Sequence, residues 1–236
     1  MRATLAATVF LALSAVTAAA GEYSPPGWGE DVYLGIPAIR YLPEDVDSTE
    51  PTPSIIIFDP RVKSPDEIVQ NFRVWDRANQ LGAEVNHVGG TSRDSTVVTK
   101  LHYLIEWLIH ASIDGGHIIG EQTIVVAFAQ AAEPALRNTC KNGDLIGALV
   151  MVDYEPDFEV DCPGPVAASI YSIHDEDEAG SHANLVNQLK DAGIAAGSLS
   201  IKPGTGYEPS FNARLYQQTG VTVEDVVMSV AGEVMP

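Results

Sequence analysis

The feature that most constrains the fold is an alternation of short apolar runs with longer amphipathic segments. Ser54 to Phe58 (SIIIF) and Thr123 to Phe128 (TIVVAF) are rich in β-branched residues and carry no charge. Such runs are typical of strands that are buried on both faces of a parallel sheet. Asp94 to Ser112 has instead the apolar period of a helix. The sequence predicts an α/β fold with a doubly wound, mostly parallel sheet and helices on both faces.

Turn and capping signals place the remaining elements. Ser64 and Thr222 each suit a helix N-cap, and Asp225 follows Thr222 at capping-box spacing. We expect strands at 31–39, 54–58, 83–88, 123–128, 145–152, 166–174 and 198–202. We expect helices at 64–80, 94–112, 182–192 and 222–234, with one more ending near residue 140. No repeat or linker divides the chain, so residues 31–236 are expected to form a single domain, preceded by an irregular leader at 21–30.

The N-terminus has the pattern of a secretory signal peptide. Arg2 is followed by an uncharged, apolar run that ends in three alanines, Ala18 to Ala20. A charged start, an apolar centre and a small-residue end are the parts of a cleavable signal. We therefore expect residues 1–20 to be removed and the mature protein to be secreted or periplasmic. No later segment has the length of apolar sequence that spans a bilayer, so we expect no membrane insertion after cleavage.

Charge and cysteine content narrow the classes of partner. The formal net charge is −19 and the pI about 4.4, so nucleic acid and anionic membrane surfaces are disfavoured as partners. The two cysteines, Cys140 and Cys162, most simply form one disulfide in an exported protein. We expect no cofactor, and the sequence carries no signal for an oligomeric state.

Three loops that follow predicted strands carry a recognisable layout. They are Ala127 to Ala132, His174 to Glu178, and Lys202 to Pro209, which contains Pro203-Gly204-Thr205-Gly206-Tyr207. Their order resembles the nucleophile, acid and histidine loops of the α/β-hydrolases. The closer resemblance is to secreted esterases of the polyhydroxybutyrate depolymerase and feruloyl esterase type, over residues 31 to 236. The placement of the two cysteines is similar to that family as well.

The resemblance implies that the catalytic residues of the family are replaced here. Its serine falls on Ala129, whose methyl group cannot attack a carbonyl. Its histidine falls on Tyr207, a phenol that is a poor base at neutral pH. Its acid falls on either Asp177 or Glu178, and without a histidine to orient that carboxylate has lost its role.

The loop that would form the oxyanion hole is also altered. The His-Gly of the family falls on Asp59-Pro60; proline has no N–H to donate, and an aspartate adds negative charge where an oxyanion would form. These changes predict a secreted pseudoenzyme without serine-esterase activity. Its former cleft, lined by Phe128, Gln130 and His174, would bind an ester, an aromatic acid or a sugar-derived ligand.

An alternative from another class is an active hydrolase that uses non-standard or metal-assisted groups. His174 and His182 flank the acidic run of Asp175 to Glu178, and histidine with carboxylate ligands is the donor set of catalytic zinc sites. The spacing matches no established ligand motif, and a solvated turn before a helix explains the same residues. His87 with Ser92 is a weaker candidate pair, since no motif places a base beside that serine.

Overall fold

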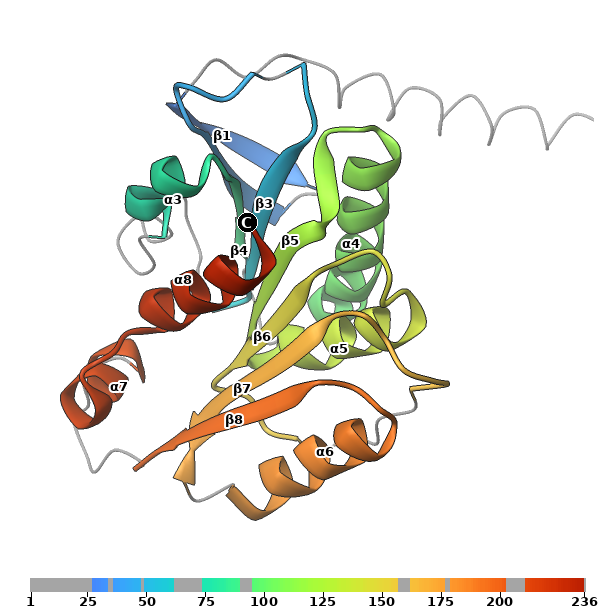
Figure 1. Cartoon of the computed structure of the whole chain (residues 1–236), viewed down its shortest axis with the longest axis vertical. Coiled ribbons are helices and arrows are strands. Elements are labelled where there is room, and N and C mark those ends of the chain that lie inside the picture. The colour runs from blue at the N-terminus through green and yellow to red at the C-terminus, as the bar shows by residue number, and fades with distance from the viewer. Residues whose placement is uncertain are drawn as a thin grey trace, which may run out of the picture.

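The computed structural model describes residues 27–33, 36–47, 49–61, 74–89, 95–156, 162–176, 179–202 and 211–235. Within these ranges eight strands form one sheet in the order β1-β2-β4-β3-β5-β6-β7-β8 (Figure 1). The strands are β1 (Gly27–Tyr33), β2 (Ile36–Leu42), β3 (Thr52–Asp59), β4 (Glu84–Gly89), β5 (Ile118–Phe128), β6 (Ala148–Val152), β7 (Ser169–Asp175) and β8 (Ala196–Ile201). The expected signal peptide lies outside the described residues.

Six helices and one short 3-10 turn accompany the strands in the part of the chain that the structure describes. They are α3 (Trp75–Leu81), α4 (Ser95–Asp114), η1 (Ala129–Ala131), α5 (Ala132–Lys141), α6 (Ala179–Asp191), α7 (Phe211–Thr219) and α8 (Val223–Val234) on the described part of the chain, with α3 and α4 flanking β4. The start expected for the first helix, at Ser64, falls outside that part.

The sheet is parallel from β4 through β3, β5, β6 and β7 to β8, while β1 and β2 pair antiparallel at one edge. In β3, Ile55, Ile56, Ile57 and Phe58 are all fully buried. Both faces of this strand are covered, which explains why its sequence is apolar without alternation. The predicted fold class is therefore confirmed.

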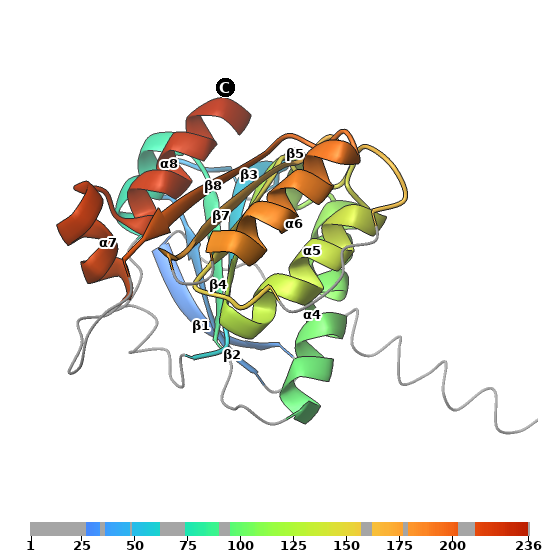
Figure 2. The same ribbon diagram turned by 90° about the horizontal axis from the view of Figure 1, so that it is seen from below.

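Helices cover both faces of the sheet (Figures 1 and 2). Side chains from α4, α5 and α6 form one core with one face of the sheet. Side chains from α3, α7 and α8 form a second core with the other face. Each large apolar side chain that is fully buried in these cores contributes about 1.5–3 kcal/mol. No helix among the described residues combines the length and the hydropathy needed to cross a membrane.

Local sequence signals act as expected at several helix ends. Thr222 and Asp225 form a reciprocal capping box at the start of α8. Gly82, directly after α3, and Gly193, two residues after the end of α6, have positive φ of 57° and 82°. Glycine is favoured there because it lacks the Cβ that penalises left-handed backbone.

Two regions differ from the sequence-based expectation. The segment expected as one strand at 31–39 is divided between β1 and β2, and β1 begins at Gly27, inside the expected irregular leader. Strand β1 pairs only with β2 in the described sheet, and an edge strand tolerates glycine better than a central one. Helix α7 was not predicted, because Phe211 and Leu215 are its only buried residues and give too short an apolar stripe.

Candidate functional site

The carboxyl ends of the parallel strands meet along one edge of the sheet, where sites form in open α/β folds. Phe128, the last residue of β5, pairs with Val152 of β6, which in turn pairs with Ile173 of β7. Ala129 and Asp153 follow Phe128 and Val152 and therefore leave the sheet at one level, whereas β7 continues through His174 to Asp175. The strand-end site described below comprises Asp59, Arg61, Phe128, Ala129, Asp153, Asp175 and Arg214.

Ala129 occupies a sharp turn between β5 and the helix that follows. Phe128 is still extended, with φ −97° and ψ 142°, whereas Ala129 has φ 48°. The chain then continues through η1 into α5. A strained strand-turn-helix junction of this kind exposes the nucleophile in α/β-hydrolases. The backbone of that elbow is present here, and its side chain is a half-buried methyl group.

The residues flanking the elbow allow the helix to approach the sheet closely. Ala127 and Ala131 are fully buried, in agreement with the view that small residues are needed on both sides of the turn. Pro134 lies at the third position of α5 and is also buried. The first helical turn has no intrahelical acceptor for its N–H groups, so a proline there costs no helix hydrogen bond.

Arg61 lies across the elbow and was missed by sequence reasoning. Its Nε and Nη2 donate to the two carboxylate oxygens of Asp59 at 2.8 and 2.9 Å, and its Nη1 donates to Asp153 Oδ2 at 2.9 Å. Asp59 ends β3 and Asp153 follows β6, and β5 lies between those strands. The guanidinium sits 4.7 Å from the centroid of the Phe128 ring. Arg61 thus bridges over the carboxyl end of β5.

The backbone N–H of Arg61 is hydrogen-bonded as well. The Arg61 N–H donates to Asp59 Oδ1 at 3.1 Å, and Pro60 has no N–H. In α/β-hydrolases the loop after this strand supplies an N–H to the oxyanion hole. Here the first candidate donor is missing and the second is bound to a carboxylate.

The charged groups of the strand-end site shift one another's pKa values. Burial raises the pKa of Asp153, and the negative charges of Asp175 and Asp59 add to the increase, while Arg61 and Arg214 oppose it. Burial lowers the pKa of the Arg61 guanidinium, but the hydrogen bonds and charges of Asp59 and Asp153 outweigh it, so its pKa is raised.

A second ion pair extends the site to α7. Arg214 donates to both carboxylate oxygens of Asp175 at 2.8 and 3.2 Å and to the Lys202 carbonyl oxygen at 3.3 Å. Its guanidinium is 5.4 Å from the Phe211 ring. Asp175 belongs to the acidic run that the sequence singled out, but nothing in the sequence identified its partner. The sequence did offer one signal that could have identified Asp153 as a site residue, because it directly follows the strand expected at 145–152.

His174 and His182 are brought together, in a way the sequence did not suggest. Their rings stack with centroids 3.7 Å apart and planes 3° from parallel, and both residues are buried, at 2% and 0% exposure. The interpretation of this segment as a solvated turn is wrong for these two residues, because His174 faces α6 from β7 and His182 faces β7 from α6. His174 therefore lies beside α6, two strands and about 10 Å from β5.

The remaining predicted residues are placed as follows. Phe128 is buried under Arg61, and Gln130 is exposed. His87 is fully buried in β4. Burial and the charge of Arg61 lower its pKa to about 4, while the charge of Asp59 opposes this decrease. Asp177, Glu178, Tyr207 and Ser92 lie outside the described residues.

The predicted disulfide is confirmed. Cys140 is bonded to Cys162, with the Cα atoms 4.7 Å apart. The bond joins the end of α5 to the segment that leads into β7. No group of three or more histidine, cysteine, aspartate or glutamate side chains that could hold a metal ion occurs among the described residues.

Comparisons with known proteins identify the fold. No protein-family model matches the sequence, and no curated protein matches it. The structure is similar to an esterase from Pyrobaculum calidifontis, with a TM-score of 0.63 and 13% identity over 100% of this chain and 95% of the esterase. A thermophilic carboxylesterase cloned from a metagenomic library gives 0.62 and 12%, over 95% of each chain. A fluorophosphonate-binding serine hydrolase from Staphylococcus aureus gives 0.58 and 8%, over 88% and 99%. The chain therefore has the α/β-hydrolase fold of these esterase-like structures.

Proposed function

We propose that this protein is a non-catalytic member of the α/β-hydrolase fold, without serine-esterase activity. The observation that carries the proposal is Ala129 at φ 48° in the turn after β5. The backbone conformation that presents a nucleophile is retained, and the side chain it presents has neither a lone pair nor an acidic proton.

The loop after β3 supports the same proposal. An oxyanion at the elbow would meet the carboxylate of Asp59 in place of N–H donors, because Pro60 has none and the Arg61 N–H is bound to Asp59. Loss of a single oxyanion-hole donor costs about 2.7–4 kcal/mol of transition-state stabilisation. Restoring a serine alone would therefore not restore an efficient esterase.

The strand-end site is proposed to bind a sugar-derived ligand in preference to an ester or an aromatic acid. Arg61 covers Phe128, so the aromatic ring offers little surface for stacking. The side chains of Arg61 and Asp153 remain 40% and 34% exposed and lie side by side. Hydroxyl groups both donate and accept hydrogen bonds, so a polyol matches an adjacent donor and acceptor.

The finer assignments from sequence remain part of the proposal. The Cys140–Cys162 disulfide joins the helix after the elbow to the segment before β7, which agrees with a relationship to the polyhydroxybutyrate depolymerase and feruloyl esterase type. A disulfide also agrees with export to an oxidising compartment after removal of residues 1–20.

Hydrolysis of p-nitrophenyl butyrate and labelling by a fluorophosphonate probe test the loss of activity. The wild type is expected to match buffer in the first assay and to remain unlabelled in the second. The Ala129→Ser variant and the Ala129→Ser, Tyr207→His double variant are the matched comparisons, with an active serine esterase as the positive control. Turnover by the wild type well above buffer would show that another group performs the chemistry.

A chelator arm in the same assay tests the metal-assisted alternative. The lone pairs of imidazole lie in the ring plane, and parallel rings do not direct them at one point. The stacked, buried arrangement of His174 and His182 is therefore unfavourable for shared coordination. Activity that is abolished by chelation would favour the alternative nonetheless.

Binding is tested by NMR titration with three probes: a neutral xylo-oligosaccharide, ferulate and methyl 3-hydroxybutyrate. The oligosaccharide is expected to shift the side-chain Nε–H signal of Arg61, and Asp153→Asn is expected to weaken that response. A response to ferulate alone would contradict the choice of a sugar-derived ligand.

A further inference from the structure

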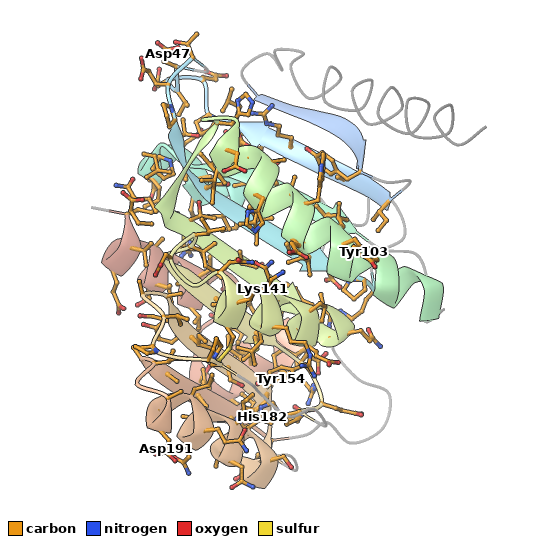
Figure 3. All side chains as sticks on the ribbon, turned by 90° about the vertical axis from the view of Figure 1, so that its right-hand side faces the viewer. Asp47, Tyr103, Lys141, Tyr154, His182 and Asp191 are labelled. Atoms are coloured by element: carbon orange, nitrogen blue, oxygen red, sulfur yellow. A yellow bond between two sulfur atoms is a disulfide. The ribbon has the colours of Figure 1, made fainter. Side chains whose placement is uncertain are left out.

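A buried polar cluster lies between β7 and α6, on the face of the sheet opposite α8. Its centre is the stacked pair of His174, from the end of β7, and His182, from α6. Tyr154, from the loop after β6, packs edge-on against His182, with ring centroids 4.6 Å apart and an interplanar angle of 81°. Figure 3 shows Tyr154 and His182 close together. Tyr154, Ser172, His174 and His182 are each less than 5% exposed.

Hydrogen bonds fix the orientation of both rings. His174 Nδ1 is 3.0 Å from the carbonyl oxygen of Asp175; a carbonyl can only accept, so this nitrogen carries the proton of neutral His174. His182 Nδ1 is 3.1 Å from Ser172 Oγ, which is itself 3.1 Å from the Tyr154 hydroxyl. The cluster therefore joins the loop after β6, strand β7 and helix α6.

The surroundings of the pair favour neutral rings. On β7, the nearest carboxylate is that of Asp175, and Arg214 of α7 binds both of its oxygens. From the loop after β6 the facing group is the uncharged Tyr154 phenol. From α6 the buried neighbours Leu185 and Leu189 are apolar. A charge placed on either ring would be desolvated, and charges on both would repel at stacking distance.

We propose that the His174–His182 stack is an acid-sensitive latch, which holds α6 on β7 while both rings are neutral and releases it when they take up protons. The proposal does not depend on the proposed function, because neither histidine belongs to the strand-end site. Release of the latch would also affect the strand-end site, because Asp175 follows His174 directly and binds Arg214 of α7.

The direction in which stability depends on pH follows from the pKa shifts of the two histidines. Burial lowers the pKa of His174, with Asp175 opposing. Burial and the charge of His174 lower the pKa of His182 from 6.5 to about 4, with a hydrogen bond to the Tyr154 backbone opposing. Unfolded histidine takes up its proton near pH 6.5. The stabilisation is thus present above that pH and is lost as the pH falls below it. For His182 the loss continues to about pH 4 and approaches tenfold in the folding equilibrium constant for each pH unit.

Urea unfolding between pH 7 and pH 5 tests the latch, because most carboxylates stay ionised in this range. For the wild type, protonation of His182 alone should lower the folding equilibrium constant about fifteenfold between pH 6.5 and pH 5. His182→Gln, which keeps a hydrogen-bonding side chain, should show a pH dependence smaller by that factor. His117→Gln, at an exposed histidine, is the matched control and should follow the wild type. Equal pH dependence in His182→Gln and the wild type would overturn the proposal.

A measurement on the unmodified protein decides the question even where the variant fails to fold. NMR titration of the histidine Cε1–H signals should give midpoints for His174 and His182 below 6.5, the ordinary value of a histidine. Hydrogen exchange should show that the amides of α6 lose protection as the pH is lowered from 6.5 to 5, after correction for the intrinsic exchange rate, while those of α8 do not. A midpoint near 6.5 for both stacked histidines, or equal loss of protection in α6 and α8, would show that the pair is not a latch.

Discussion

Ala129 and Asp153 leave neighbouring strands side by side, and both have left-handed backbone conformations, with φ of 48° and 51°. Among the described residues they are the only two, glycine apart, with positive φ. Phe128 pairs with Val152, so the two strained residues follow β5 and β6 at the same level. Strain of this kind persists only where surrounding structure imposes it, and it is common at functional sites.

Ala129→Gly should increase the free energy of unfolding by about 0.5–1 kcal/mol, because glycine removes the Cβ penalty of a positive φ. Urea denaturation measures the change. Ala135→Gly, in the buried face of α5, is the control and should lower stability by about 1 kcal/mol. A loss of stability in both variants would mean that the elbow is not strained.

Arg61→Ala should lower the free energy of unfolding by about 1–3 kcal/mol, a range below that for a fully buried pair because the arginine is 40% exposed. The loss arises because the carboxylate of Asp59, only 5% exposed, would lose its counter-charge. Arg137→Ala removes an exposed pair with Glu133 and should cost about 0.5 kcal/mol or less. Equal effects of the two variants in chemical denaturation would show that the Arg61 bridge contributes no more than a surface pair.

Removal of the disulfide by a Cys140→Ser, Cys162→Ser double substitution should lower the free energy of unfolding by about 3 kcal/mol. The estimate follows from the sequence separation of 22 residues, which sets the loop entropy of the unfolded chain. A reducing agent should destabilise the wild type similarly and leave the double variant unchanged. Two free thiols in the mass spectrum of protein made in an oxidising compartment would contradict the bond.

Thr222→Ala should lower the free energy of unfolding by about 1 kcal/mol, since the Thr222 hydroxyl accepts from the Asp225 N–H at 3.1 Å. Hydrogen bonds from Thr222 and the charge of Arg77 lower the pKa of Asp225. The cap therefore stabilises above pH 4 and loses that contribution in more acidic solution. Ser229→Ala, at an exposed position of the same helix, should be neutral or slightly stabilising.

Much of the fold could be predicted because its signals are local. The apolar runs of β3 and β5, the stripe of α4 and the capping box at Thr222 each depend on residues close in sequence. Helix α7 gave no such signal, since two buried residues do not establish a period. The start of β1 at Gly27 was missed because proline and glycine were taken to indicate an irregular leader, although an edge strand accepts glycine.

The sequence by itself determined that an alanine, Ala129, follows the apolar run of residues 123–128 and that Pro60, which has no N–H, follows Asp59, because the functional groups that a residue lacks can be read without a structure. Only the tertiary structure decided which other side chains lie beside these residues. Arg61 reaches Asp153 across 92 positions of sequence, and His174 stacks on His182 rather than facing solvent. Such contacts depend on which strands are neighbours and on which face of a strand or helix each residue lies. The packing of the whole sheet sets both, and no local pattern encodes them.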